Sequence, residues 1–244
     1  MGKAESNACP EGRGFSPDYW VDSGDVEGEV LRWLADGGNI AGGDADQEDD
    51  KCQDRTGEER KEFRKQPKEC DSFDKELSER FEFRNILPEE ADQAAEIEKV
   101  CFPPNEACSE TMMKERVAAA PELFLVAVDR KTGRLAGFLN GLSTKECAFR
   151  DEFFSDSGLY DPEGKNIMLL GLDVLPEYRG QGLAREIVSR YLCREQERGR
   201  RLLILTCLES KVKMYEKMGF RNYGIAKSSW GGEEWYEMGY VLDD

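Results

Sequence analysis

Histidine is absent from this chain of 244 residues. Histidine titrates nearest to neutral pH and is the most common zinc ligand, so its absence removes the usual general base and argues against a metal site. Cysteine offers no replacement, because the eight cysteines are scattered without a CxxC pair. We therefore expect no metal and interpret the cysteines as free thiols, with Cys193 and Cys207 buried in the core.

Long apolar runs and positive charge are also scarce. No apolar run approaches the ~20 residues that cross a bilayer, and the acidic start lacks the basic and apolar regions of a signal sequence or organellar presequence. Acidic residues outnumber basic ones by 51 to 34, which gives a net charge of −17. This charge argues against nucleic acid or an anionic membrane as a partner. We expect a cytoplasmic protein, and a monomer.

Composition divides the chain near residue 80. Residues 1–50 hold 13 acidic and 3 basic side chains, and residues 51–80 are dense in both charge signs with few apolar residues. This predicts an acidic, disordered extension over 1–79 and one folded domain over 80–244. Within the extension, residues 26–38 favour a short helix. Such a helix either docks on the domain or on a partner protein, or has no function.

From Phe81 onward, strands and helices alternate as in an α/β domain. We expect Pro88 to start a helix that buries Ala95, Val100 and Phe102 and ends at the double proline 103–104. A second helix over 109–120 has Ser109 as its N-cap. The predicted strands are 81–87, the two arms of a hairpin over 123–143 with its turn at 131–133, and 166–175, 201–207, 220–228 and 235–242.

The segment 172–192 contains a glycine-rich turn between a strand and a helix. Its sequence at 179–184 is RGQGLA, and the helix that follows has an apolar stripe and ends at Gly199. Gly180 and Gly182 allow close backbone approach, and the helix N-terminus attracts anions, so the turn suits a pyrophosphate. Neither GxxxxGK[ST] nor GxGxxG is present, which excludes a P-loop and a dinucleotide-binding turn. The alternative is an ordinary strand-to-helix turn.

Two motifs carry a resemblance to a known family. Arg179, Gly182 and Ala184 fit the three fixed positions of the acetyl-CoA loop of the GCN5-related N-acetyltransferase (GNAT) superfamily. Tyr215, before a Gly-Phe exit at 219–220, fits a second block after the strand at 201–209. Over roughly 81–242 the chain most resembles the arylalkylamine (serotonin) N-acetyltransferase group, through blocks at 101–108, 121–128, 161–175 and 228–238.

The resemblance implies an α/β GNAT fold, in which helices flank a mixed central sheet. Counted from Phe81, its fourth and fifth strands splay apart and the pantetheine arm of acetyl-CoA, the co-substrate, fills the gap. The arm pairs with backbone groups of Leu172 and Val174, and Arg179, Arg185 and Lys211 attract the phosphates. By family position, the cofactor-binding residues are Leu172, Asp173, Val174, Arg179, Gly180, Gln181, Gly182, Leu183, Ala184, Arg185 and Ser210.

The implied reaction transfers acetyl to the primary amine of a small arylalkylamine by direct attack in a ternary complex. Tyr215 has the position of the acid that protonates the leaving thiolate, although it could be only a packed aromatic. Met168 and Leu170 replace the two histidines that assist deprotonation in vertebrate members. Either another group takes the proton, or the proton leaves along a water chain. Glu106 is the first carboxylate candidate for the role of base, unless it is a solvated loop charge. Asp173 ranks lower, because strand alternation turns it away from Met168 and Leu170.

The substrate is inferred from apolar side chains that would form its pocket. These are Phe102, Pro104, Met168, Leu170 and Trp230, which suit an arylalkyl group. The connection 147–165 is either a lid or a surface loop pinned by its aromatics. Two other functions stay open: a GNAT that acetylates a protein, a peptide or a polyamine, with the acidic extension recruiting a basic partner, and a CoA-binding module without catalysis.

Overall fold

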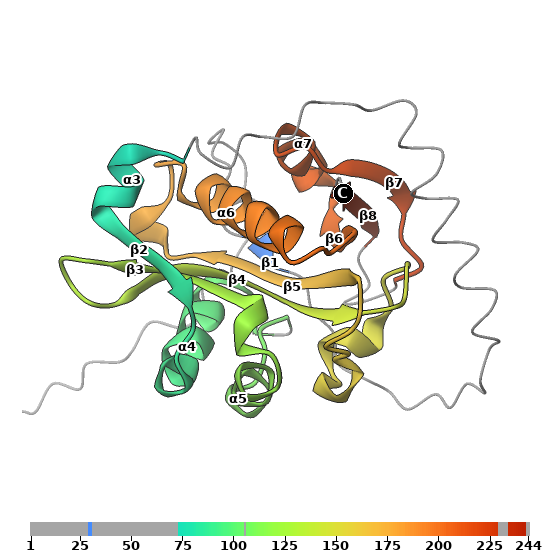
Figure 1. Ribbon diagram of the computed structural model, residues 1–244, viewed down its shortest axis with the longest axis horizontal. Coiled ribbons are helices and arrows are strands. Elements are labelled where there is room, and N and C mark those ends of the chain that lie inside the picture. The colour runs from blue at the N-terminus through green and yellow to red at the C-terminus, as the bar shows by residue number, and fades with distance from the viewer. Residues whose placement is uncertain (1–28, 31–72, 105, 229–233, 243–244) are drawn as a thin grey trace, which may run out of the picture.

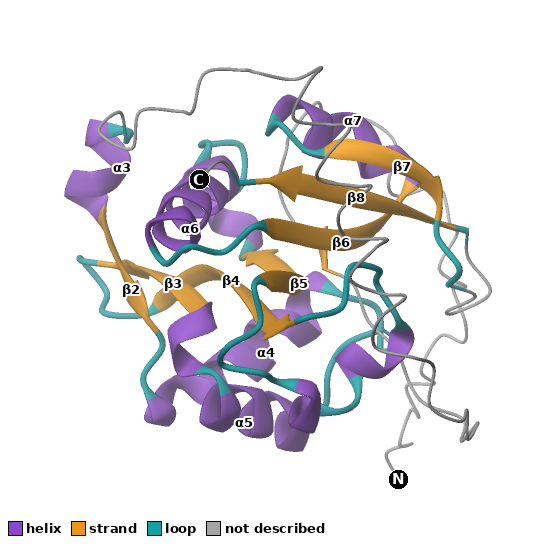
Figure 2. Ribbon diagram, turned by 45° about the vertical axis from the view of Figure 1, so that its right-hand side comes forward, coloured by secondary structure: helices purple, strands orange, loops and turns teal. Residues whose placement is uncertain are grey.

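The computed structural model describes residues 29–30, 73–104, 106–228 and 234–242. Within them, eight strands form one sheet with the order β2-β3-β4-β5-β6-β8-β7, and β1 pairs with β5 outside this path. Figure 2 shows the strands and helices. The strands are β1 Glu29–Val30, β2 Phe81–Asn85, β3 Phe124–Asp129, β4 Leu135–Thr144, β5 Asn166–Val174, β6 Leu202–Leu208, β7 Arg221–Ile225 and β8 Trp235–Val241. The α-helices are α3 Lys75–Arg80, α4 Ala91–Cys101, α5 Glu110–Ala119, α6 Leu183–Glu197 and α7 Glu209–Lys217.

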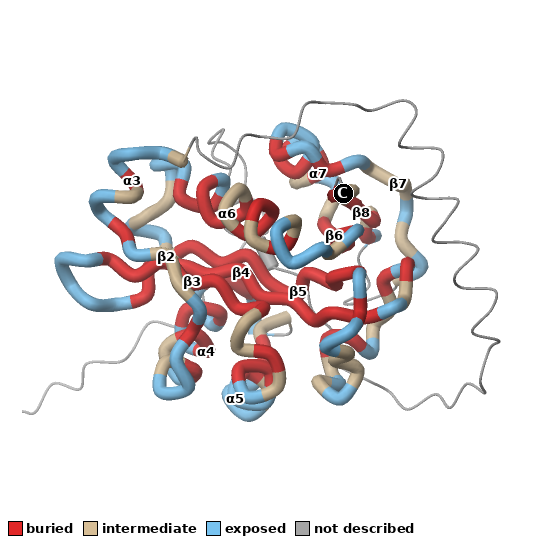
Figure 3. Tube along the Cα trace, viewed as in Figure 1, coloured by how far each residue is buried: buried red, intermediate tan, exposed pale blue. Residues whose placement is uncertain are grey.

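Helices cover both faces of the sheet. In Figure 1, α4 and α5 lie below it, and α3, α6 and α7 lie above it. The central strands β3, β4, β5 and β6 are buried over almost their whole length (Figure 3). The predicted α/β order of elements is therefore confirmed. The apolar stripe of α6 packs onto the sheet as predicted, with Leu183, Ile187, Val188, Tyr191 and Leu192 all buried.

The layer of α4 and α5 differs from the prediction at one helix. A 3₁₀ turn at Pro88–Glu90 precedes α4, which ends at Cys101, before the two prolines. Val100 is 57% exposed, so its assignment to the buried side was wrong. The helix turns Ala94, Ala95 and Ile97 toward the sheet instead, and Val100 lies outside this arc. Ser109 caps α5 as predicted, because its side chain accepts a hydrogen bond from the Met112 N–H.

The strands β5 and β6 separate along their length. They are parallel and pair only at the start, from Asn166 with Leu202 to Met168 with Ile204. Beyond these pairs β5 continues to Val174 and β6 to Leu208. Counted from Phe81 these are the fourth and fifth strands, so the predicted splay is confirmed. It leaves backbone groups of β5 available to another extended chain.

One such chain already lies there. β1 pairs antiparallel with β5, Glu29 with Leu172 and Val30 with Gly171. The other edge of β5 pairs with β4 at these residues. β1 therefore occupies the β5 edge that faces the splay. The prediction of a helix over 26–38 was therefore wrong at Glu29–Val30, which form a strand, and the rest of that segment lies outside the described residues.

The cysteines follow the prediction with one exception. Cys101, Cys108, Cys193 and Cys207 are free and buried. Cys147 is disulfide-bonded, so its assignment as a free thiol was wrong. Its partner is none of the four free cysteines, and spacing along the chain cannot reveal a pair joined across a fold. Among the described residues, no helix is long and apolar enough to span a membrane.

Candidate active site

The turn after β5 has the geometry of an anion site. Gly180 and Gly182 adopt φ angles of 71° and 82°, a region that other residues rarely enter. Gly182 is the N-cap of α6 and, having no side chain, makes no capping hydrogen bond. The turn therefore lies at the positive end of the helix, which attracts anions. Gly180, Gln181 and Gly182 are exposed to solvent.

Arginine side chains approach this turn from two directions. Arg179 donates from Nε to the Val174 carbonyl at 2.9 Å and from Nη2 to the Cys101 sulfur at 3.5 Å, so it ties the turn to β5 and α4. Arg80, at the end of α3, donates from Nη1 to the Gln181 amide oxygen. Sequence reasoning missed Arg80, because nothing in a charge-rich segment indicates which residue meets a turn a hundred positions away.

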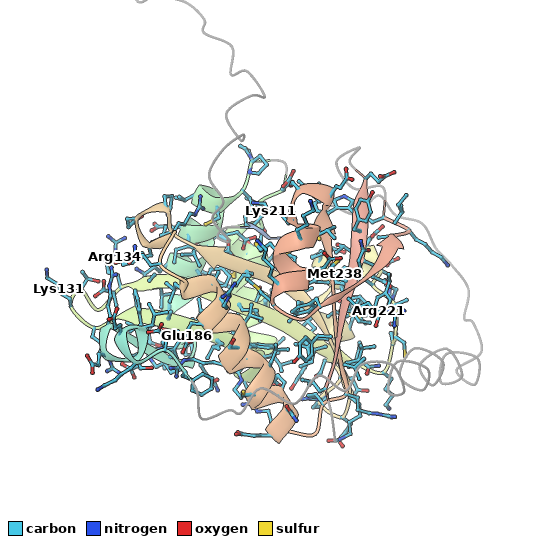
Figure 4. The ribbon with its side chains drawn as sticks, turned by 90° about the horizontal axis from the view of Figure 1, so that it is seen from above. Lys131, Arg134, Glu186, Lys211, Arg221 and Met238 are labelled. Atoms are coloured by element: carbon cyan, nitrogen blue, oxygen red, sulfur yellow. The ribbon has the colours of Figure 1, made fainter. Side chains whose placement is uncertain are left out.

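Charges on α6 and α7 complete the surroundings of the turn. Glu186 would repel a phosphate, but it is buried and accepts from Arg190 Nε at 2.7 Å. Figure 1 shows α6 and α7 on the same side of the sheet, and Figure 4 labels Glu186 on α6 and Lys211 on α7. Ser210 and Arg185 lie in the first turns of α7 and α6, and both are exposed.

A β-bulge in β5 changes which way its side chains face. In the β4–β5 register Asn140 pairs with Gly171 and Gly141 with Leu169, so Leu170 is an extra residue. The bulge reverses the alternation of side chains beyond it. Met168 pairs with Leu142 and Asp173 with Phe138, four residues apart on regular β4, so Met168 and Asp173 share a face. The expectation that they point to opposite faces was wrong.

That shared face is the one covered by α4 and α5. Phe138, the cross-strand partner of Asp173, belongs to the core cluster built on these helices. Asp173 is 0% exposed, and Asn140, beside it on β4, is 1% exposed. Within the described residues the Asn140 Oδ1 atom has no hydrogen-bond partner. A buried polar atom without a partner indicates local strain, a bound water molecule or a functional site.

Other ionisable groups surround Asp173 from α4 and α5. Burial, and then the charge of Asp173, raise the pKa of the Cys101 thiol to about 12. Burial lowers the pKa of the Arg116 guanidinium, whereas Cys108 and Asp173 act to raise it. Arg116 is buried, and its Nη1 has no partner among the described residues. Asp173 thus shares its surroundings with the Arg116 guanidinium and the Cys101 thiol.

The loop between α4 and α5 carries the predicted base Glu106. Phe102 is buried, Pro104 is exposed and Glu106 is half-buried, with its N–H donating to the Pro103 carbonyl at 2.9 Å. The buried Glu98 of α4 holds the far end of the loop, where it accepts from the Cys108 N–H at 3.4 Å. Sequence reasoning missed Glu98, whose position in a helical pattern gave no functional signal.

The connection between β4 and β5 is pinned, which favours the second of the two interpretations given to 147–165. Phe153 and Phe154 are buried, and the Phe154 carbonyl accepts from Arg116 Nη2. Glu237 of β8 accepts from the Phe149 N–H at 3.0 Å. Buried side chains from α5 and β8 thus hold the connection against the α4–α5 side of the molecule.

The remaining predicted residues lie deep in the fold. Tyr215, on α7, is 2% exposed, and its ring packs edge-on against Phe220 with centroids 5.6 Å apart. Met168 and Leu170 are fully buried in β5. Trp230 lies outside the described residues. Among those described, no three acidic or thiol side chains gather in a way that could hold a metal ion.

An α/β sheet with a splayed strand pair and a glycine-rich turn at a helix N-terminus defines a class of proteins that bind phosphate-bearing ligands beside the gap. The model of the acetyltransferase (GNAT) family matches residues 91–220, more than half of the chain. The chain therefore belongs to the GNAT family of acetyltransferases. No curated protein matches it in sequence.

Solved structures share the fold. GphF, a GNAT-like decarboxylase in complex with isobutyryl-CoA, matches 66% of this chain and 100% of its own with 18% identity and a TM-score of 0.58. The loading GNAT-like domain of CurA from Lyngbya majuscula matches 66% and 98% with 13% identity and a TM-score of 0.58. Ard1 from Thermoplasma volcanium matches 67% and 99% with 15% identity and a TM-score of 0.54.

Proposed function

We propose that this protein is a cytoplasmic N-acetyltransferase that transfers acetyl from acetyl-CoA to the primary amine of a small arylalkylamine. The observation that carries the proposal is the glycine-rich turn at the N-terminus of α6 beside the splay of β5 and β6. A pyrophosphate fits the first and an extended pantetheine arm fits the second. GphF, which shares the fold, is in complex with isobutyryl-CoA.

Different residues bind the pyrophosphate and the pantetheine arm of acetyl-CoA in this proposal. The N–H groups of residues 180–184 face the pyrophosphate, and Arg80, Arg185 and Lys211 offset its charge in a strongly acidic protein. The arm pairs with the β5 edge at Leu172, where β1 already shows that the edge accepts an extended backbone. Arg179 holds the turn in place.

The reaction needs a neutral amine and a stabilised leaving group. The amine nitrogen attacks the thioester carbonyl, the C–N bond forms and the C–S bond breaks. Tyr215 donates a proton to the departing thiolate. Glu106 and Asp173 are the two carboxylates that could take the proton of the ammonium. No metal takes part in this proposal.

The amine is assigned by the chemistry of the surrounding side chains. Phe102, Pro104, Met168, Leu170 and Trp230 are the apolar side chains that we assign to the pocket of an aryl group. A net charge of −17 favours a cationic acceptor over an anionic one. Both features fit an arylalkylamine better than an acidic or sugar acceptor.

An acetyl-transfer screen tests the proposal. Purified protein is given acetyl-CoA and, separately, tryptamine, serotonin, phenethylamine, spermidine or a basic peptide, and release of free thiol is measured. We expect the aryl amines to give the highest kcat/KM, with initial rates that fit a ternary-complex scheme. Preference for the peptide would identify a protein acetyltransferase, and binding of acetyl-CoA without transfer to any amine would indicate a module without catalysis.

A further inference from the structure

The bulge at Leu170 places a carboxylate and an amide together on the α4–α5 face of the β4–β5 pair. Asp173 faces this side beside Phe138, and Asn140 faces it opposite Gly171. Because Gly171 has no side chain, the space in front of the Asn140 amide is not filled from β5. Asn140 thus lies between the bulge and Asp173 along the strand pair.

We propose that Asp173 is the proton acceptor of the acetyl-transfer reaction and that Asn140 positions the amine, or the water through which its proton passes. This assignment rests on the proposed function and decides between its two carboxylates. The splay of β5 and β6 exposes one edge of β5 to the cofactor, and the bulge turns Asp173 and Met168 to the same face of that strand.

The two carboxylates differ in how strongly solvent stabilises their charge. Glu106 lies half-buried on a loop, and a carboxylate in contact with water is a weak base. Asp173 is 0% exposed. Burial removes water from a carboxylate and favours its protonated form, which makes it a better proton acceptor. A buried carboxylate can thus replace the histidines that this chain lacks.

The groups facing Asp173 allow it to exchange a proton. From α5, the buried guanidinium of Arg116 interacts electrostatically with Asp173, and this interaction acts to raise the pKa of Arg116. From α4, the Cys101 thiol stays protonated, since its pKa lies about 12. Glu98 of α4 and Cys108 are further ionisable groups on this side among the described residues, and Arg179 donates from Nη2 to the Cys101 sulfur.

The proton balance is simple. Asp173 takes one proton from the ammonium, and the neutral amine attacks the acetyl carbonyl. As the C–S bond breaks, the thiolate takes a proton from Tyr215, which regains one from the nitrogen of the new amide. The proton on Asp173 leaves to solvent after the products depart, so each turnover releases one proton.

The test compares acceptors that do and do not need a base. Wild type and Asp173→Asn are assayed with phenethylamine, which is protonated at neutral pH, and with phenylhydrazine, which is not. We expect kcat/KM to fall ~10²- to 10⁴-fold with phenethylamine and less than ~10-fold with phenylhydrazine. The acetyl-CoA Kd stays unchanged. The rate with phenethylamine should rise again at high pH, where free amine is abundant.

Two further variants provide a second test and a control. Asn140→Ala should also lose more kcat/KM with phenethylamine than with phenylhydrazine, but by a smaller factor. This variant tests the proposal if Asp173→Asn does not fold. Glu195→Gln is the control, since Glu195 is equally buried but lies at the far end of α6. It should lower the melting temperature and leave the ratio between the two acceptors unchanged.

The outcomes separate the two proposals. An equal loss with both acceptors in Asp173→Asn means that Asp173 is structural and overturns this assignment alone. An acceptor-dependent loss in Glu106→Gln, with none in Asp173→Asn, transfers the role to Glu106. If the wild type acetylates neither acceptor, the proposed function fails and this assignment fails with it.

Discussion

Replacement of Gly182 by glutamate should abolish acetyl-CoA binding by charge repulsion. The backbone strain of the same substitution should lower the stability of the domain separately. Gly182 has φ of 82°, and among the described residues a Cβ at this position would meet only the Leu77 Cδ1 atom, at 4.0 Å. Gly133, in the β3–β4 turn, has φ of 70°, and no atom of the described residues lies within 4 Å of its Cβ position. Gly133→Glu is therefore a matched control with the same backbone strain in another part of the molecule.

The loss of stability and the loss of acetyl-CoA affinity can be estimated separately. A residue with a side chain in the left-handed region costs ~1–2 kcal/mol, which lowers the melting temperature of a domain of this size by roughly 2–8 °C. Both variants should show this loss. At position 182 a carboxylate would also meet the pyrophosphate. Two like charges ~4–5 Å apart at an effective dielectric constant of ~20 repel by ~3–4 kcal/mol, or more than ~100-fold in Kd.

Calorimetric titration with acetyl-CoA and a thermal melt measure both effects. We expect equal melting temperatures for the two variants and measurable acetyl-CoA binding only for Gly133→Glu. If Gly133→Glu weakens binding as much as Gly182→Glu, the effect is one of stability, and the turn before α6 is not the pyrophosphate site. Unchanged binding in Gly182→Glu would refute the site directly.

Three further predictions follow from single contacts. Tyr215→Phe should lower kcat at least ~10²-fold with little change in acetyl-CoA Kd, whereas Tyr191→Phe should only lower the melting temperature, because the Tyr191 hydroxyl donates to a buried carbonyl at 3.1 Å. Removing residues 1–72 should lower the acetyl-CoA Kd, since it deletes the β1 strand that pairs at the β5 edge; a higher Kd would contradict this. Burial raises the pKa of Asp151 to about 7, so its contribution to stability is full below the unfolded value of ~3.9 and is lost as pH rises to about 7. Asp151→Asn should therefore flatten this part of the curve of melting temperature against pH.

The elements and the turn were predictable because they depend on local patterns. The apolar stripe of α6, the Ser109 cap and the glycine at the hairpin turn each act within a few residues, and all three appear as expected. The splay of β5 and β6 was not a local inference. It came from a resemblance carried by two motifs, and the short parallel register bears it out.

The failures have a different physical origin, since each depends on a residue distant in sequence. The disulfide of Cys147 joins positions that no spacing rule connects. Arg80 reaches Gln181 only because α3 packs beside the turn. The face of Asp173 was wrong because a bulge is set by the pairing of two strands. A run such as LLGLDV has the same alternation with or without an extra residue in it.

The bulge also explains how one buried strand can serve a core and a reaction at once. With regular alternation, Asp173 and Met168 would lie on opposite faces of β5. In our proposal the amine is bound on the α4–α5 face, so a carboxylate there would have to replace an apolar residue. The extra Leu170 avoids this conflict, because Leu172 stays on the α6 face, paired with Leu139, while Asp173 joins Met168 under α4 and α5. A chain without histidine can then keep a carboxylate dry beside an apolar surface, which is the condition under which a carboxylate becomes an effective base.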